Sequence, residues 1–394
     1  MSDLLFLCQR IPYPPNKGDK LRAFHVLKHL AQRYRVRLGC FIDDPDDWRH
    51  LDSLKPYCAE IKAARLTPTV AKALALRGLL TGEALSLPYF RSGLLADWVD
   101  GLLKAGSVQA IYGFSSTMAQ YVLDRDLTGI PFVQDIVDVD SDKWRQYAAR
   151  KSGIARWVYQ REYNTLLSFE RKVAAKADAS LFVSEAEADL FRKLVPEHAG
   201  KVHAVSNGID LDFFDPDAAM ENPYTGETGP VIAFTGAMNY WPNEDAVAWF
   251  VAEIFPAIRR AHPTAAFYIV GANPTPPVSA LADQNGVHVT GRVEDIRGYI
   301  RFADLCVAPM KVARGIQNKV LEGLAMARPL VTTPQGHEGI DAEPGRDLLV
   351  AADAAPFAED CLAALAPETA ATLGTAGRKL VLDRYAWAPN LEKI

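Results

Sequence analysis

The stretch that decides the fold is Arg314-Gly315-Ile316-Gln317-Asn318-Lys319-Val320-Leu321-Glu322-Gly323-Leu324-Ala325-Met326-Ala327-Arg328-Pro329-Leu330-Val331. Its apolar residues Val320, Leu321 and Leu324 recur at helical spacing. The pair Arg328-Pro329 ends that helix before an apolar strand. The run from Asp304 to Pro309, just upstream, has the composition of a buried parallel strand. The order strand, loop, helix, strand predicts an open α/β sheet.

The loop before this helix is a candidate phosphate site. Open α/β sheets bind ligands at the carboxyl ends of their strands, and a helix N-terminus offers free backbone N–H groups there. Gly315 allows a tight turn, Arg314 and Lys319 add two cations, and Glu322 lies one turn after Lys319 on the same face. Two cations suit a diphosphate, and one carboxylate suits ribose hydroxyls. An ordinary helix with a snorkelling lysine and a solvated glutamate is the alternative.

Residues 315–331 follow the pattern Gly-Ile-x-Asn-Lys-x-Leu-Glu-x-x-Ala-x-x-x-Pro-Leu-Val, which resembles the nucleotide-sugar motif of family-4 glycosyltransferases. In that family two glutamates usually bracket seven residues, and the second corresponds to Glu322. Arg314 stands at the place of the first. The resemblance implies the GT-B fold, an α/β architecture of two Rossmann-like domains facing each other across a cleft. It also implies donor-binding roles for Gly18, Gly236, Asn239, Arg292, Arg314, Gly315, Ile316, Gln317, Asn318, Lys319 and Glu322.

Further similarities and departures lie along the chain. Residues 206–214, Ser-Asn-Gly-Ile-Asp-Leu-Asp-Phe-Phe, resemble the interdomain hinge of the family, and residues 384–387 resemble the signature of its terminal helix. The expected organisation is an acceptor-side domain over 1–205, a linker over 206–229, a nucleotide-sugar domain over 230–375 and a terminal helix over 376–394 that crosses back to the first domain. Many relatives place Arg just after Gly236 and Lys near position 243, where this chain has Ala237 and Asn243.

Length and composition restrict the class of protein. The chain has 394 residues, too many for one ordinary core, with 49% hydrophobic and 23% charged residues. No secretory signal and no apolar run long enough to cross a bilayer are visible, and the five cysteines have no metal-ligand spacing, so we expect a cytoplasmic protein. The chain has no G-x-G-x-x-G, which argues against a dinucleotide-binding oxidoreductase.

Charge is divided unevenly. Residues 1–205 carry 29 Lys and Arg against 24 Asp and Glu, a net charge of +5, whereas residues 206–394 carry 14 against 24, a net charge of −10. A basic N-terminal half fits an anionic acceptor or an anionic membrane surface.

Three carboxylates follow an apolar strand at residues 130–137. Asp138 and Asp140 could bind a divalent metal through oxygen ligands. We instead expect Asp135 or Asp138 to line the catalytic cleft, where related enzymes often carry a histidine, and Asp140 to cap the next helix. A capping role for all three is the alternative. No metal and no cofactor are expected.

The segment from Lys143 to Lys176 is rich in both basic and aromatic residues. This composition suits an anionic lipid interface or a nucleic acid, and the alternative is a solvated helix whose aromatic rings face the core. We expect peripheral contact with an anionic membrane and no nucleic acid. The apolar stretch from Pro68 to Leu80 is expected to be helical and to pack in the core, an interfacial helix being the second interpretation.

The resemblance implies a retaining transfer of a sugar from a nucleoside-diphosphate sugar to the hydroxyl of a glycan or lipid-linked acceptor. Residues 314–319 and 138–144 look most like the sugar transferases associated with exosortase and bacterial exopolysaccharide systems, which would act at the inner face of the plasma membrane. Two alternatives remain: a nucleotide-sugar epimerase of the same fold, and a non-catalytic nucleotide-sugar or glycan-binding partner.

Overall fold

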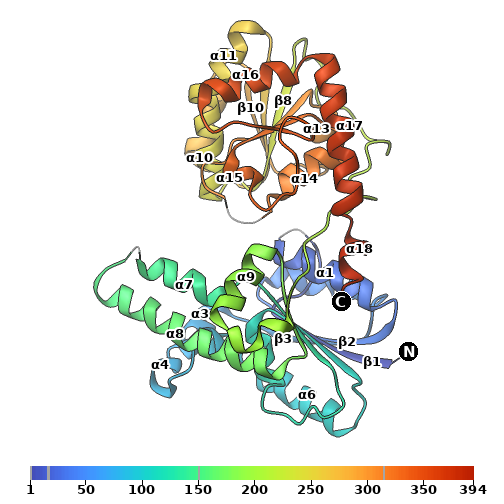
Figure 1. Cartoon of the computed structure of the whole chain (residues 1–394), viewed down its shortest axis with the longest axis vertical. Coiled ribbons are helices and arrows are strands. Elements are labelled where there is room, and N and C mark those ends of the chain that lie inside the picture. Colours follow the sequence, from blue (N-terminus) through green and yellow to red (C-terminus); the bar gives the residue numbers. More distant parts are fainter. Residues whose placement is uncertain (1, 16–17, 150, 314–315) are drawn as a thin grey trace. The chain divides into compact units, whose positions relative to one another are not determined.

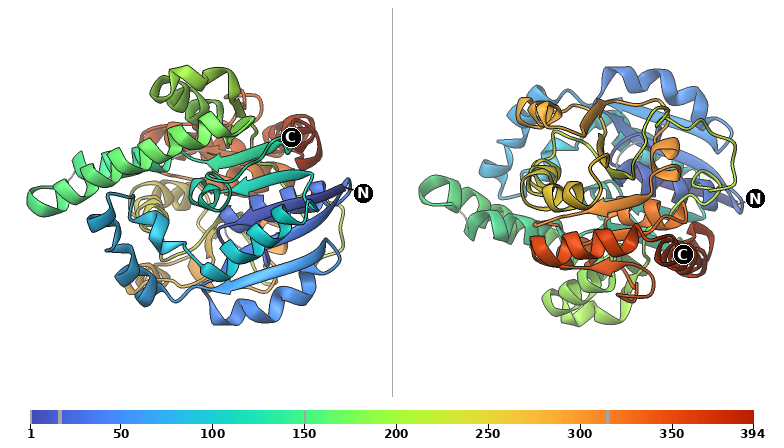
Figure 2. Two further views of the ribbon diagram at one scale, coloured as in Figure 1. Left: turned by 90° about the horizontal axis from the view of Figure 1, so that it is seen from below. Right: turned by 90° about the horizontal axis from the view of Figure 1, so that it is seen from above.

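The computed structural model describes residues 2–15, 18–149, 151–313 and 316–394. The chain divides into two compact units (Figure 1), an N-terminal unit of Met1–Ser206 with Leu391–Ile394 and a C-terminal unit of Asn207–Asn390. Each unit contains one parallel sheet with helices on both faces (Figure 2). The predicted α/β fold with two Rossmann-like domains is therefore confirmed.

The sheet of the N-terminal unit has its described strands in the order β3-β2-β1-β4-β5-β6-β7. These strands are apolar runs such as residues 4–8, which are buried on both faces of the sheet, as parallel strands require. The strands are β1 (Ser2–Cys8), β2 (Tyr34–Ile42), β3 (Cys58–Arg65), β4 (Ala110–Phe114), β5 (Phe132–Val137), β6 (Ala179–Phe182) and β7 (Val202–Ala204). The helices are α1 (Gly18–Leu30), η1 (Pro45–His50), α2 (Leu51–Leu54), α3 (Pro68–Ala75), α4 (Gly78–Thr81), α5 (Ser86–Tyr89), α6 (Gly93–Lys104), η2 (Ser116–Tyr121), α7 (Asp140–Ala149), α8 (Gly153–Lys176), α9 (Glu185–Leu194) and η3 (Pro196–Lys201).

The sheet of the C-terminal unit has its described strands in the order β10-β9-β8-β11-β12-β13. They are β8 (Val231–Thr235), β9 (Ala266–Val270), β10 (Val287–Gly291), β11 (Leu305–Ala308), β12 (Leu330–Thr332) and β13 (Leu349–Val350). The helices are α10 (Trp241–Trp249), η4 (Phe250–Ile254), α11 (Phe255–Ala261), α12 (Pro276–Ser279), η5 (Ala280–Asp283), α13 (Arg297–Arg301), α14 (Asn318–Ala325), α15 (Pro334–His337), α16 (Ala354–Ala364), α17 (Pro367–Arg384) and α18 (Trp387–Leu391). The order β11, loop, α14, β12 is the one that residues 304–331 predict.

The segment expected to be a linker is attached to the C-terminal unit. Three arginines bind its backbone carbonyls: Arg297 that of Phe213 at 3.2 Å, Arg301 that of Pro216 at 2.7 Å and Arg378 that of Phe214 at 3.1 Å. The hydroxyl of Tyr224 donates to the carbonyl of Tyr299 at 2.6 Å. Residues 213–224 are therefore part of a folded unit and not a free tether.

The end of the chain differs from the expected boundary at residue 375. That position lies inside α17, which runs unbroken from Pro367 to Arg384, and Gly374 and Gly377 let this helix pack closely against the rest of the C-terminal unit. A Cβ at Gly374 would meet the carbonyl oxygen of Ala327 at 2.4 Å. Only Leu391–Ile394 group with the N-terminal unit.

Candidate functional site

The carboxyl ends of the strands in the C-terminal unit meet at one edge of the sheet. Gly236 follows β8 and Gly271 follows β9, and a Cβ on Gly271 would lie 1.7 Å from the carbonyl oxygen of Gly236. Only glycine fits such an approach of two backbones. The two loops therefore lie against each other beside the N-terminus of α14, which follows the neighbouring strand β11.

A lysine, an asparagine and a glutamate form a cluster at this edge, which we call the Lys319 cluster (Lys319, Asn243 and Glu322). Lys319 lies in the first turn of α14, and its Nζ donates to Oδ1 of Asn243 at 3.2 Å. Nδ2 of Asn243 donates to the carbonyl of Ala237 at 2.9 Å, so the buried amide fixes the β8–α10 loop and presents its oxygen to the lysine. The Nζ also lies 5.3 Å from the ring centroid of Phe234, within cation–π range.

The electrostatics of the cluster are shaped by burial. Burial lowers the pKa of the Lys319 ammonium to about 8, against the attraction of Glu322. Burial likewise raises the pKa of the Glu322 carboxyl to about 7, and the nearby lysine opposes this rise. Both groups therefore titrate close to neutral pH. Because they are desolvated, water stabilises neither the ammonium nor the carboxylate well. A bound anion beside the Nζ would stabilise the charged lysine.

The other predicted donor residues lie around this edge with different exposures. Ile316, Gln317 and Asn318 are half-buried at the start of α14, whereas Asn239 and Arg292 are exposed. Arg314 and Gly315 lie outside the described residues.

Arg292 lies apart from the cluster. It follows β10, which β9 separates from β8 in the sheet. It lines a surface hollow of about 550 Å³ together with Thr290 and Tyr299. The structure thus brings Lys319, Glu322 and Gly236 together and leaves Arg292 at the sheet's edge.

Two features of this edge escaped the sequence reasoning. Asn243 counted only as a departure from the family pattern, yet it is the partner of Lys319. Tyr240 and Trp241, at the start of α10, are 58% and 55% exposed. The sequence signal for them is two adjacent aromatic residues directly before Pro-Asn at a helix start. It would indicate a sugar-binding position, because exposed aromatic rings pack well on sugar faces.

Asp135 does not line a surface, which corrects the expectation from the sequence. Its Oδ2 accepts from Nε of Arg22 at 2.8 Å and from the hydroxyl of Tyr112 at 2.7 Å, and all three side chains are buried. Arg22 also donates to the carbonyl of Val205 at 2.7 Å. Asp135 therefore joins α1, β4, β5 and the end of the N-terminal unit in a buried ion-pair network.

Of the two residues expected to line the cleft, Asp135 and Asp138, only Asp138 has an accessible carboxylate. It follows Val137, which has φ 75°, and the adjacent strand β4 is followed by Ser115, which has φ 72°. Non-glycine residues rarely adopt such angles, and strained backbone of this kind concentrates at functional sites. Nζ of Lys143 lies 3.1 Å from Asp138 and 2.9 Å from Asp140, so a lysine holds the position that a divalent cation would take between them.

These ion pairs also shift pKa values. Burial raises the pKa of Asp140, and Lys143 opposes the rise. The two carboxylates in turn raise the pKa of Lys143 above its usual range despite its burial.

Gly18 is the first residue of α1 and is exposed, and among the described residues outside its chain neighbours no atom lies within 4 Å of where its Cβ would be. The described contacts therefore do not require glycine at this position, and its donor-binding role is a proposal.

Two families match the chain. The family described as glycosyl transferases group 1 matches residues 229–366, and the glycosyl transferase 4-like domain matches residues 21–208. The two matches together cover most of the chain. A search of the curated proteins finds no match.

Solved structures of similar fold include HepE from Anabaena in complex with UDP-glucose, with 15% identity, coverage of 100% of this chain and 98% of the other, and a TM-score of 0.68. Sucrose-phosphate synthase from Thermosynechococcus elongatus has 18% identity, coverage of 100% and 97%, and a TM-score of 0.69. WaaG, a glycosyltransferase involved in lipopolysaccharide biosynthesis, has 16% identity, coverage of 99% and 98%, and a TM-score of 0.64. At these identities the likeness shows the fold.

Proposed function

The chain belongs to the group 1 glycosyltransferases and is a retaining glycosyltransferase, and we propose that it moves a hexose from a nucleoside-diphosphate hexose to an acceptor hydroxyl in the synthesis of a cell-surface glycan. The observation that carries the proposal is the Lys319 cluster, in which a desolvated lysine lies at the N-terminus of a helix beside two glycine loops. Those features together form a site for a diphosphate.

The roles at the donor site follow from charge. When the bond between the anomeric carbon and the phosphate oxygen breaks, negative charge develops on the leaving diphosphate. We propose that Lys319 and the backbone N–H groups at the start of α14 stabilise that charge from positions fixed by the fold. Glu322 matches the second glutamate of the family motif, and we propose that its carboxylate binds the ribose hydroxyls. Arg314 is proposed as a second phosphate contact.

The acceptor side is proposed to include Asp138 in the N-terminal unit. Retention of configuration requires the acceptor oxygen to attack on the face that the diphosphate leaves. A leaving phosphate oxygen can take the acceptor proton, so no strong side-chain base is required, and Asp138 with its strained neighbour Val137 orients the acceptor. Lys143 occupies the gap between Asp138 and Asp140, which supports transfer without a divalent metal.

The biological setting is proposed from the sequence pattern. Residues 138–144 and 314–319 resemble transferases of bacterial exopolysaccharide systems, in which a soluble donor meets a lipid-linked acceptor at the cytoplasmic leaflet. No helix among the described residues is long and apolar enough to cross a bilayer.

Calorimetric titration with UDP and GDP tests the donor site. Lys319→Ala should weaken binding by ~1.5–3 kcal/mol, about 10- to 150-fold, because a charge-assisted contact is lost. Lys379→Ala, an exposed lysine of α17, is the matched control and should bind normally. Equal affinity of Lys319→Ala and the control would refute the site, and a panel of labelled nucleotide sugars would then identify the sugar transferred by the native chain.

A further inference from the structure

Two segments of the N-terminal unit expose large apolar side chains next to cations. On α3, on α4 and between them the exposed large apolar residues are Val70, Leu76, Leu79 and Leu80, the last 91% exposed. Around the turn from α7 to α8 they are Tyr147, Ile154 and Trp157, with Ile154 83% exposed. Lys72, Arg77, Lys151 and Arg156 are exposed in the same segments. We call these residues together the apolar-basic surface.

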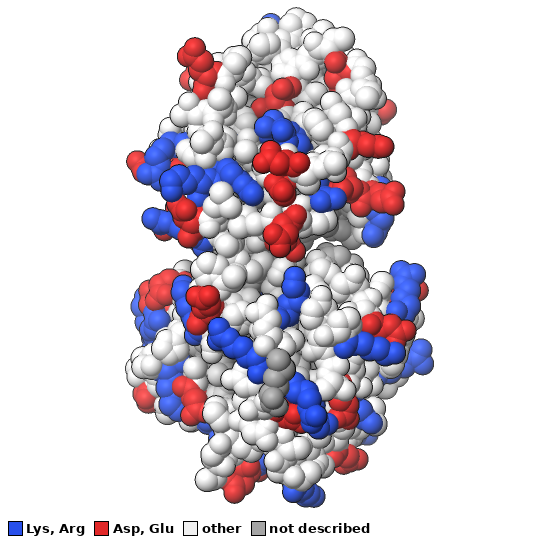
Figure 3. Space-filling model, turned by 90° about the vertical axis from the view of Figure 1, so that its right-hand side faces the viewer, with Lys and Arg blue, Asp and Glu red and all other residues white. Residues whose placement is uncertain are grey.

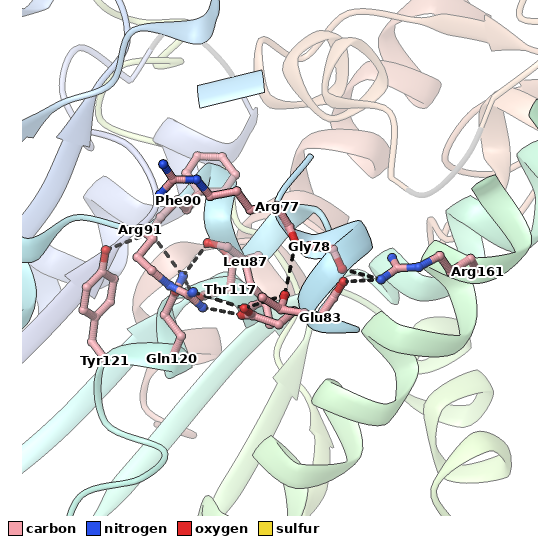
Figure 4. A network of polar contacts seen from close by, with 11 residues as sticks. Arg77, Gly78, Glu83, Leu87, Phe90, Arg91, Thr117, Gln120, Tyr121 and Arg161 are labelled. Carbon is pink, nitrogen blue, oxygen red and sulfur yellow. Dashed lines mark hydrogen bonds and ion pairs between the residues drawn. The ribbon is translucent and has the colours of Figure 1, made fainter. Parts of the chain in front are cut away.

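The two segments are joined to each other. Nη2 of Arg161 in α8 donates to the carbonyl of Gly78 at 2.5 Å and to that of Glu83 at 3.0 Å (Figure 4). The buried carboxylate of Glu162 accepts from the backbone N–H groups of Leu85 and Ser86 at 2.7 and 3.1 Å. These contacts tie the start of α4 and the connection from α4 to α5 to α8, one turn after Trp157, so both segments project from the same side of the unit (Figures 1 and 2).

The charge of this surface has one sign. Residues 66–82 and 143–161 contain no Asp or Glu. The face of the N-terminal unit drawn in Figure 3 is different, because cations and carboxylates lie side by side there. Apolar side chains next to exposed cations complement a layer that is anionic outside and apolar inside.

The structure also corrects the extent of the basic aromatic segment. The second half of α8 is core, since Leu166, Phe169 and Val173 are buried together with Glu170. Stretch 68–80, expected to pack in the core, instead exposes its leucines. The apolar-basic surface therefore lies within residues 68–81, 145–149 and 151–157, and not over the whole of residues 143–176.

We propose that the apolar-basic surface docks the protein on a bilayer containing anionic phospholipids, with Leu80, Ile154 and Trp157 entering the headgroup region and the cations pairing with lipid phosphates. This proposal rests on the proposed function in one respect, namely that docking brings the enzyme to a lipid-linked acceptor. Docking itself needs neither donor nor acceptor.

Sedimentation of the full chain with vesicles tests the proposal. The native protein should bind phosphatidylglycerol-phosphatidylcholine vesicles and not pure phosphatidylcholine, and binding should weaken as salt screens the attraction over a Debye length of about 8 Å at physiological ionic strength. Lys151→Glu with Arg156→Glu should lower affinity by at least about 25-fold, which is about fivefold or ~1 kcal/mol for each cation. Leu80→Ser with Trp157→Ser should also lower it, without changing the ionic-strength dependence of the remaining binding.

The matched control is Leu94→Ser with Lys104→Glu on α6, where both side chains are exposed outside this surface. It should bind vesicles like the native chain. Brominated lipids should quench part of the tryptophan fluorescence, and Trp157→Phe should remove that part.

Sedimentation that is equal for anionic and neutral vesicles, or that the surface variants leave unchanged, would overturn the proposal. Two other outcomes would also overturn the proposal, provided that the native chain does not bind vesicles. They are dimerisation that depends on protein concentration and binding of nucleic acid, if the surface variants abolish either one. Turnover on a water-soluble acceptor should persist in all the variants, so failure of docking is distinguishable from failure of the transfer reaction.

Discussion

The pKa of Lys319, about 8 because of burial, makes its charge depend on pH in a range where free lysine does not titrate. A bound diphosphate would raise this pKa, so binding takes up a proton whenever the free lysine is neutral. Above pH 8 the affinity for UDP should therefore fall, approaching about tenfold per pH unit, while below pH 7 it should not depend on this lysine's titration.

Calorimetry in two buffers of different ionisation enthalpy would count the protons taken up. Lys319→Arg keeps a charge that cannot be lost in this range, and its affinity should stay constant from pH 7 to 9.5. A parallel decline in the native chain and Lys319→Arg would assign the titration to another group.

Asp135 and Asp138 lie three residues apart in the sequence but differ in environment. Asp135 neutralises the buried Arg22, so Asp135→Ala should destabilise the protein by about 3–5 kcal/mol by leaving a buried charge unpaired. Asp138→Ala removes a half-exposed carboxylate and should change the free energy of unfolding by less than about 1 kcal/mol, while reducing turnover.

Denaturant unfolding and initial rates measured on both variants would separate the two roles. An Asp135→Ala protein that is as stable as the native chain but inactive would mean that Asp135 acts in catalysis and not in stabilising the fold.

At the scale of elements, the loops after β8 and β9 depend on the absence of a side chain. Gly271→Ala would place a Cβ 1.7 Å from the carbonyl oxygen of Gly236, so we expect a loss of stability of at least about 3 kcal/mol and weaker nucleotide binding. Gly18→Ala is the matched comparison, because its Cβ would meet no protein atom.

Thermal unfolding and UDP titration would measure both substitutions. Gly18→Ala should leave the melting temperature unchanged or slightly raised, since alanine is the better helix former. Reduced turnover in that stable variant would indicate that a ligand approaches the backbone at Gly18, whereas normal turnover would mean that glycine is used there only for the turn.

For the whole molecule, the division into units separates the donor site from the rest of the chain. The Lys319 cluster, both glycine loops and the attached segment 213–224 all belong to Asn207–Asn390. A fragment of residues 207–390 should therefore fold and bind UDP within about threefold of the native affinity, but should transfer no sugar.

Titration of the purified fragment would decide this point. Loss of binding in a fragment that shows cooperative unfolding would mean that the N-terminal unit contributes directly to the nucleotide site.

The sequence by itself determined the local structure of the chain. Apolar runs such as residues 305–308 gave buried parallel strands, and the spacing of Val320, Leu321 and Leu324 gave α14, because strand and helix periodicity depend on neighbours only a few residues away. The family pattern over 315–331 located a candidate donor site on the same grounds, since its residues are contiguous.

Only the tertiary structure decided which side chains meet and which face water. Asp135 and Asp138 look alike in the sequence, but only Asp135 lies opposite Arg22, a residue 113 positions away. Asn243 and Lys319 are 76 positions apart, so their contact follows from the neighbouring positions of β8 and β11 in the sheet and from no local signal. Leu76, Leu79 and Leu80 look like core residues by composition, yet all three are exposed. Burial and long-range pairing depend on how the whole chain packs, which no single stretch of sequence contains.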